Sequence, residues 1–294
     1  MNHRVFDVTR RGLTAAFAAT ASGLVGACSP LTAFNTLAPR DPATRAGRDI
    51  PYGPDPLQSL DVFAPVQGAR RAPVLLFFHG GGWNSGRRQD YAFVGQALAS
   101  RGFVTVVAGY RLAPQVVYPG FMDDAAAATR WARDHASAFG GDADNLMVCG
   151  HSAGAYIAMM LALDPSFLRA AKVDPAQICA VAGLSGPYQF LPLDAPETRT
   201  AFGGFPDLPS TQPINHIRPG APPAFLAHGS KDTLVWVSNT IDLGRALTTA
   251  GDVAEVKIYP GLSHADMVLA LSRTFRHKAP VLDDMTAFLM AHQT

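Results

Sequence analysis

Short runs of β-branched and aromatic residues alternate with longer runs of helical character along the chain from Leu60 onward. This alternation predicts an α/β fold in which a mainly parallel central sheet is flanked by helices on both faces. The predicted strands are Ser59 to Phe63, Pro73 to Phe78, Val104 to Gly109, Asn145 to Gly150, Ile178 to Leu184, Ala224 to His228 and Ala254 to Tyr259. The predicted helices are Asp90 to Arg101, Phe121 to Phe139, Ala153 to Leu163, Val237 to Ala250 and Pro280 to Ala291. In such sheets, functional residues gather in the loops beyond the carboxyl ends of the strands.

The composition excludes several classes of protein. Of the 294 residues, 48% are hydrophobic and 16% are charged, which is enough apolar material for one large core and too little charge for a disordered chain. The 24 basic residues are scattered and the formal net charge is +1. The concentrated basic surface that nucleic-acid binding requires is therefore missing, and no nucleic-acid partner is expected.

The 3 cysteines are too few for a disulfide framework and show no paired metal-ligand spacing. Cys149 and Cys179 fall in predicted strands that are neighbours, but their positions along those strands differ by about three residues, or roughly 10 Å. We therefore expect two buried free thiols. The histidines outside the motifs described below also form no ligand spacing, so the sequence predicts neither a metal nor a cofactor.

A G-x-S-x-G motif, Gly150-His151-Ser152-Ala153-Gly154, ends the predicted strand that begins at Asn145. A predicted helix begins directly behind the serine, and this strand-to-helix turn is the context that the motif requires. The turn holds the serine in a strained backbone, and bulky side chains in place of the glycines would collide across it. The placement of the motif predicts that Ser152 is a nucleophile.

A glycine-rich segment, His79-Gly80-Gly81-Gly82-Trp83, ends the predicted strand Pro73 to Phe78. Consecutive glycines expose backbone N–H groups that can point at a developing oxyanion. An ordinary glycine-rich turn is the alternative interpretation. The segment lies one strand-helix-strand-helix unit before the serine, which is where esterases and lipases carry their oxyanion loop.

Two more candidates follow later strands: Asp232, after the strand that ends at His228, and His264, after the strand that ends at Tyr259. A serine hydroxyl needs an imidazole to take its proton, and a carboxylate holds that imidazole in the correct tautomer. Taken alone, Asp232 could be a helix N-cap and His264 an ordinary loop histidine. The chain order Ser, Asp, His matches the order of α/β-hydrolases, so we predict that Ser152, Asp232 and His264 form a catalytic triad.

The glycine-rich segment, the serine motif and Tyr110-Arg111-Leu112-Ala113-Pro114 together resemble hormone-sensitive-lipase-like and related bacterial carboxylesterases, from about Leu60 to His264. This resemblance implies an α/β-hydrolase fold and a serine esterase acting through an acyl-enzyme. It also implies that the N–H groups of Gly81, Gly82 and Ala153 form the oxyanion hole and that Trp83 contacts the substrate.

Three nearby residues are expected to have other roles. Asp266 lies too close in sequence to His264 to orient its ring, and His151 is expected to be a packing or supporting residue that points away from the serine. Arg111 and Lys231 are expected to be structural charges.

About 40 residues between Leu184 and Ala224 contain Tyr188, Phe190, Phe202 and Phe205 among prolines and glycines. They could roof the site and line an acyl pocket, or they could form a small apolar cluster under a long loop. The segment before the first predicted strand is too short for the larger N-terminal cap of many hormone-sensitive-lipase-like enzymes, which favours small to medium acyl or aryl esters. Arylformamidase-like and feruloyl-esterase-like relatives, and a non-catalytic hydrolase-fold module, stay open as alternatives.

The N-terminus predicts export. Arg10-Arg11 precedes a weakly hydrophobic stretch, Gly12 to Ala27, which is too short for a transmembrane helix and resembles a twin-arginine signal. Val25-Gly26-Ala27-Cys28 resembles a bacterial lipobox, in which Cys28 would be lipidated and become the mature N-terminus. An amphipathic start helix and ordinary signal-peptidase cleavage after Ala27 are the alternatives.

These features predict a signal peptide at residues 1–27, a tether at 28–55 and one α/β-hydrolase catalytic domain at 56–294 with a lid-like insertion at about 186–222. The protein is expected in the periplasm or anchored to a bacterial membrane through its lipid, with a small-molecule ester as substrate. The sequence does not fix an oligomeric state.

Overall fold

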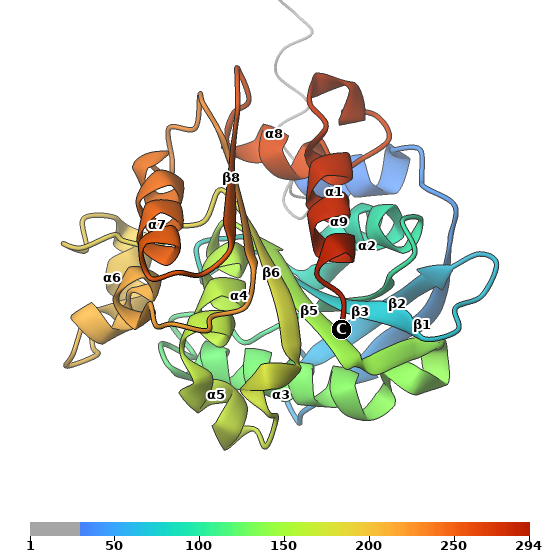
Figure 1. The fold of residues 1–294 in the computed structure, drawn as a ribbon, viewed down its shortest axis with the longest axis horizontal. Coiled ribbons are helices and arrows are strands. Elements are labelled where there is room, and N and C mark those ends of the chain that lie inside the picture. The colour runs from blue at the N-terminus through green and yellow to red at the C-terminus, as the bar shows by residue number, and fades with distance from the viewer. Residues whose placement is uncertain (1–29) are drawn as a thin grey trace, which may run out of the picture.

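The computed structural model describes residues 30–294, so the predicted signal peptide and Cys28 lie outside the described residues. Its centre is an 8-stranded sheet with the order β1-β2-β4-β3-β5-β6-β7-β8 (Figure 1). The strands are β1 Ala43–Pro51, β2 Ser59–Pro65, β3 Ala72–Phe78, β4 Val104–Ala108, β5 Gly141–His151, β6 Ile178–Leu184, β7 Ala224–Gly229 and β8 Ala254–Tyr259. The β1–β2 and β2–β4 pairs are antiparallel and the remaining pairs are parallel, as expected for an α/β-hydrolase fold.

Helices cover both faces of this sheet because each face is apolar. The α-helices are α1 Pro30–Leu37, α2 Ala92–Ala99, α3 Gly120–His135, α4 Ala153–Leu163, α5 Pro165–Ala170, α6 Pro196–Phe202, α7 Ser238–Thr249, α8 His264–Leu269 and α9 Val281–Ala291. The short 3-10 helices are Arg88–Tyr91, Ala136–Phe139, Pro175–Gln177, Pro209–Thr211, Pro213–His216 and Arg276–Lys278. One core layer contains buried residues of α3, α4 and α7, and the other contains residues of α2, α8 and α9 (Figure 1).

The prediction of an irregular tether at 28–55 is wrong over two segments, because α1 and the edge strand β1 lie within it. Only one neighbour pairs with β1, and its side chains are mostly exposed, so it shows no alternation of apolar and polar residues. Polar contacts help to hold it: the Asp49 N–H donates to Asp61 Oδ1 at 2.8 Å. The predicted strands all occur: β6 and β8 have the predicted bounds, and β2, β3, β4, β5 and β7 have shifted ends.

The sheet register explains the two cysteines. Cys149 on β5 is paired with Ala182 on β6, three positions along the strand from Cys179. Both cysteines are free and buried, which confirms the prediction.

The insertion at residues 186–222 connects β6 to β7 and contains α6, and its aromatic residues divide between two roles. Tyr188 and Phe202 are fully buried in the core. Phe190 is partly buried and packs on Trp83, with 5.7 Å between the ring centroids. The segment is therefore both an apolar cluster and, through Phe190, a wall of the cavity described below.

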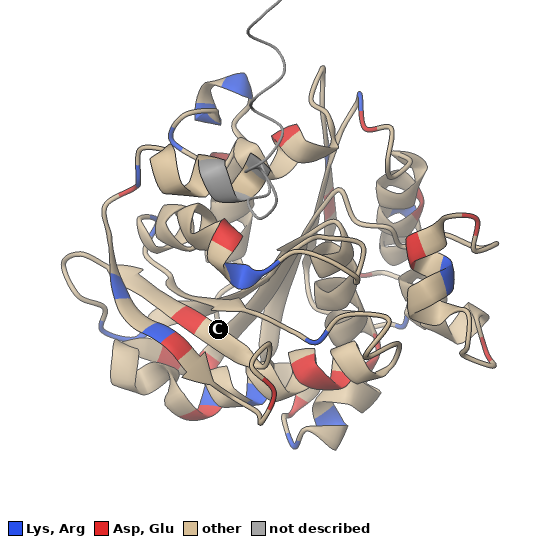
Figure 2. Cartoon of the chain, turned by 180° about the vertical axis from the view of Figure 1, so that it is seen from behind, with Lys and Arg blue, Asp and Glu red and all other residues tan. Residues whose placement is uncertain are grey.

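In the part of the chain that the structure describes, Lys and Arg residues alternate with Asp and Glu residues along the ribbon in the view of Figure 2. Within residues 30–294, no helix is long and apolar enough to cross a bilayer. The same part of the chain contains no group of three or more His, Cys, Asp or Glu side chains placed to hold a metal ion.

Candidate active site

Ser152 occupies the sharp turn between β5 and α4. Its backbone has φ 57° and ψ −124°, a left-handed conformation that a non-glycine residue rarely adopts. The Ser152 N–H donates to the Leu184 carbonyl on the neighbouring strand at 2.9 Å, which fixes the turn against the sheet. A Cβ atom at Gly154 would lie 2.0 Å from the Phe78 carbonyl oxygen, so only glycine lets the start of α4 pack this closely on β3.

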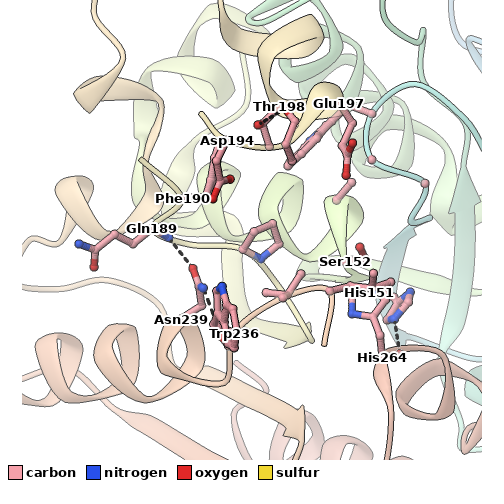
Figure 3. Close-up of a pocket in the computed structure, with 18 of the residues that line it drawn as sticks. His151, Ser152, Gln189, Phe190, Asp194, Glu197, Thr198, Trp236, Asn239 and His264 are labelled. Carbon is pink, nitrogen blue, oxygen red and sulfur yellow. Dashed lines mark hydrogen bonds between the residues drawn. The ribbon is translucent and has the colours of Figure 1, made fainter. Parts of the chain in front are cut away.

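His264 and Asp232 are joined by a hydrogen bond, although 32 residues separate them along the chain. Nδ1 of His264 lies 2.8 Å from Oδ2 of Asp232. A carboxylate accepts hydrogen bonds, so Nδ1 carries the hydrogen and Nε2 is left free to accept a proton. Ser152 and His264 both line one cavity, and their side chains are shown together in Figure 3.

Asp232 is held by more than His264. Its Oδ1 accepts hydrogen bonds from the N–H groups of Leu234 and Val235, each at 3.0 Å. Oδ2 also lies 3.0 Å from Nε2 of His228, a buried residue of β7. Burial raises the pKa of Asp232, but the hydrogen bonds from His228, His264 and Val235 outweigh it and hold that pKa far below its usual range. The alternative interpretation of Asp232 as a helix N-cap is wrong, because the next helix, α7, begins at Ser238 with Val237 as its N-cap.

The backbone at His264 is fixed from two sides. His264 is the first residue of α8, and Ser263 and Asp266 form a reciprocal capping box across that helix end. Asp266 also pairs with Lys278 and makes no bond to His264, in line with the role expected for it. On the other side, the carbonyl of His264 accepts from Nε2 of His151 at 3.0 Å.

His151 is buried and supports His264 rather than acting on the serine. Its ring packs on the His264 ring at 4.8 Å between centroids. Burial and the neighbouring His264 lower its pKa to about 3, so the ring is neutral at physiological pH. This agrees with the supporting role that the sequence predicts.

The glycine-rich loop after β3 lies opposite the serine. Gly81 has φ 131° and Gly82 has φ 57°, conformations that favour glycine. The N–H groups of Gly81, Gly82 and Ala153 donate no hydrogen bond to any other described backbone group, and all three residues line the cavity with Ser152. They are therefore available to a bound oxyanion.

Tyr110 and Trp83 support this loop. The Tyr110 hydroxyl donates to the His79 carbonyl at 2.8 Å, and its ring stacks on that of His79. Trp83 is only 2% exposed and packs edge-on against Tyr156 and Phe202, so most of its ring belongs to the core, although it also borders the cavity. The sequence did not indicate the role of Tyr110.

Arg111, expected to be a structural charge, forms several hydrogen bonds to buried Asp124, one of them 2.7 Å long. Arg111 therefore ties the segment after β4 to helix α3. Lys231 is exposed and lies outside the cavity lining.

The cavity beside Ser152 has a volume of about 520 Å³. The segment 187–198 forms one wall, and the loop between β7 and α7 forms another (Figure 3). Asp194 and Glu197 border the cavity, and no Lys or Arg side chain does so within residues 30–294. Trp236, at the rim, is 73% exposed. The sequence pointed to the aromatic residues of this region but not to the two acids or to Trp236.

Comparisons with known proteins agree with this architecture. The family model described as BD-FAE matches residues 60–247, which is more than half of the chain. Esterase LipC of Mycobacterium tuberculosis is 31% identical over 251 residues, covering 77% of this chain and 61% of the relative. The probable isoprenylcysteine alpha-carbonyl methylesterase ICMEL1 of Arabidopsis thaliana is 28% identical over 246 residues, covering 76% of this chain and 51% of the relative.

Among solved structures, esterase B from Lactobacillus rhamnosis has a TM-score of 0.77 at 22% identity, over 89% of this chain and 90% of that one. This likeness shows the shared α/β-hydrolase fold. The chain spans only about half to three fifths of the length of the two curated relatives. The match to the family model over most of the folded domain nevertheless places the chain in the BD-FAE family.

Proposed function

We propose that the chain is a serine carboxylic-ester hydrolase, with Ser152 as nucleophile, His264 as general base and Asp232 as the orienting acid. The observation that carries this proposal is the meeting of residues from three separate loops. The His264–Asp232 hydrogen bond and the strained Ser152 turn lie at one cavity, next to unused backbone N–H groups. Membership of the BD-FAE family and the esterase relatives also support it.

Acylation follows from this geometry. Ser152 Oγ attacks the ester carbonyl carbon while its proton passes to Nε2 of His264. The carbonyl electron pair moves to oxygen, and the N–H groups of Gly81, Gly82 and Ala153 stabilise the oxyanion. When the carbonyl re-forms, the bond to the alcohol breaks and the alcohol leaves with the proton from His264. Ser152 remains as an acyl ester.

Deacylation repeats these steps with water. His264 takes a proton from water as its oxygen attacks the acyl carbon, and the second oxyanion occupies the same site. Ser152 then leaves with the proton from His264, and the carboxylic acid is released. Throughout, Asp232 stays ionised because its hydrogen bonds hold its pKa low, so it stabilises the imidazolium that forms in each step.

The cavity supports small to medium acyl or aryl esters as substrates. Its volume lies in the lower half of the range for small-molecule sites, and Phe190, Leu191 and Trp236 offer apolar contacts. From the glycine-rich segment and the serine motif, we also propose a close relationship to hormone-sensitive-lipase-like enzymes. The match to the BD-FAE family does not by itself show this relationship.

The proposal is tested with one substrate panel: p-nitrophenyl esters of increasing chain length, aryl and feruloyl esters, and N-formylkynurenine. We expect ester hydrolysis by the wild type and a loss of roughly a thousandfold to a millionfold in Ser152→Ala. Near-wild-type ester turnover by Ser152→Ala would contradict the mechanism. A preference for N-formylkynurenine over every ester would favour the formamide alternative, and a lack of any turnover would favour the non-catalytic alternative.

We also propose that the protein is exported, with Cys28 lipidated, on the basis of the N-terminal sequence alone. The test is metabolic labelling of the full chain with a palmitate analogue in a bacterial host. The expected result is label in the membrane fraction that Cys28→Ser abolishes. Equal labelling of Cys28→Ser, or cleavage after Ala27 without a lipid, would overturn the lipid anchor.

A further inference from the structure

A second histidine meets the acid of the proposed triad. His228 is the fifth residue of β7, its side chain is completely buried, and it lies four residues before Asp232. Its Nε2 lies 3.0 Å from Oδ2 of Asp232, the same oxygen that accepts from His264. The proposed steps of ester hydrolysis assign no role to this residue.

The hydrogen-bond partners of His228 fix its tautomer. Nε2 is 3.0 Å from the Val235 carbonyl as well as from the Asp232 carboxylate, and both of these oxygens only accept hydrogen bonds. Nε2 must therefore carry a hydrogen, which bonds to the Val235 carbonyl and also faces the Asp232 carboxylate. Nδ1 lies 2.8 Å from the hydroxyl of Thr240, a fully buried residue of α7 that can donate to it.

Both carboxylate oxygens of Asp232 thus have two contacts each. Oδ1 accepts from two backbone N–H groups, and Oδ2 has two imidazole nitrogens within 3.0 Å. The carboxylate is planar, so rotation about the Cβ–Cγ bond would move Oδ1 away from its two backbone N–H groups at the same time as it moved Oδ2 away from His264. The contact with His228 adds a further restraint, because the same rotation would separate Oδ2 from the buried Nε2 of His228.

We infer that His228 is a positioning residue of the catalytic centre, which fixes the Asp232 carboxylate against His264, and that Thr240 fixes the tautomer of His228. The inference rests on the proposed function. The resulting chain of contacts runs from α7 to the base: Thr240, His228, Asp232 and His264. Ser152 lines the same cavity as His264. His151, another titratable side chain, contacts the His264 ring and donates to the His264 carbonyl.

The test compares two matched pairs of variants, His228→Leu with His228→Gln and Thr240→Val with Thr240→Ser. The second member of each pair keeps a hydrogen-bonding group and the first member does not. For p-nitrophenyl butyrate, we expect His228→Leu to lower kcat by about tenfold to a hundredfold with little change in KM, and His228→Gln to recover part of the loss. Thr240→Val should lower kcat by about threefold to tenfold, and Thr240→Ser should restore it.

A double-mutant cycle separates positioning from general structural support. If His228 acts through Asp232, the substitution His228→Leu should have almost no further effect on kcat in an Asp232→Asn background. Equal effects of His228→Leu in the two backgrounds would overturn the inference, as would an unchanged kcat in the single variant. Should His228→Leu fail to fold by circular dichroism, the Thr240 pair decides in the same way: an unchanged kcat in Thr240→Val would overturn the inference.

A second measurement separates this inference from the proposed function. An alkyl p-nitrophenyl phosphonate reacts with an activated serine and needs no ester turnover. The wild type should be phosphonylated at Ser152, and His228→Leu and Thr240→Val should react more slowly by the same factors as above. No reaction at Ser152 in any variant contradicts the proposed function and the inference with it. Reaction of all variants at the wild-type rate contradicts the inference alone.

Discussion

The two sides of the cavity differ in how firmly the structure holds their polar groups. On the side of Asp232 and His264, each polar atom of the acid has a partner within 3.0 Å, and capping and ring contacts fix the backbone of the base. On the side of the insertion, Asp194 and Glu197 form no ion pair within the described residues, and Trp236 lies exposed at the rim.

This difference separates chemistry from selection of the substrate. Proton transfer requires atoms held in one arrangement, and a dense set of hydrogen bonds provides it. A wall with exposed and unpaired side chains interacts weakly with many substrates and can change without loss of the reaction. Substitutions on the first side should therefore mainly lower kcat, and substitutions on the second should mainly change KM and the preference among substrates.

Asp232→Asn should have the largest effect. The amide can no longer hold His264 in the tautomer that leaves Nε2 free, and kcat should fall by about ten-thousandfold. Steady-state kinetics with p-nitrophenyl butyrate measure this, with KM as the internal control. A loss smaller than about tenfold would show that Asp232 is not the orienting acid.

Gly81→Ala should follow. At φ 131° a Cβ atom would lie 2.2 Å from the Ser85 carbonyl oxygen, so the loop must shift and move its N–H groups away from the oxyanion. We expect kcat to fall by about a hundredfold or more. Gly204→Ala is the matched control, because a Cβ at Gly204 would meet no atom within 4 Å and Gly204 does not border the cavity. Equal activity of the two variants would remove Gly81 from the proposed oxyanion hole.

Acid should destabilise the protein through His79, at the start of the glycine-rich loop after β3. Burial lowers the pKa of His79 to about 4 from an ordinary value near 6.5, so the unfolded chain binds a proton more readily than the folded one. The contribution of this residue to stability is complete above pH 6.5 and should fall by about 2.5 kcal/mol on acidification to pH 4.5. Urea unfolding above pH 6.5 and at pH 4.5 should show a smaller loss of unfolding free energy in His79→Asn than in the wild type. The asparagine keeps a hydrogen-bond donor for the Gly80 carbonyl. An equal loss in the variant would contradict this assignment.

Trp236→Ala should have a smaller effect, confined to binding. The exposed indole offers a face to aryl esters at the rim, and its removal should raise KM for phenyl butyrate by about fivefold with kcat unchanged. Val253→Ala, another exposed apolar residue that lies away from the cavity, is the control. A fall in kcat comparable with that of Gly81→Ala would abolish the distinction between the two sides.

Glu197→Gln should have the smallest effect. The carboxylate repels anionic substrates, but solvent screens it, so kcat/KM for a negatively charged ester such as a p-nitrophenyl hemisuccinate should rise by only about threefold. The rate for p-nitrophenyl butyrate should stay within experimental error, and the gain should shrink at high salt. A gain that is the same for neutral and anionic esters would mean that charge does not cause it.

The strands, the order of the three candidate residues and the two glycine-rich turns could be predicted from sequence because each has a strong local pattern. Ser152 is marked by its flanking glycines and by the strand before it. β1 was missed because an edge strand with exposed side chains shows no apolar alternation. The role of His228 could not be predicted either, because nothing in the sequence shows that Thr240 and Val235 meet its ring. The acids of the insertion lie in a segment without periodicity, so only the fold brings them to the cavity.

Acid quenching of the enzyme during turnover of p-nitrophenyl butyrate, followed by peptide mass spectrometry, shows whether Ser152 carries the acyl group. We expect a butyryl group on the peptide that contains Ser152 in the wild type, and none in Ser152→Ala. A butyryl group on another residue that turns over at the rate of catalysis, or rapid hydrolysis by Ser152→Ala, would contradict this role of Ser152.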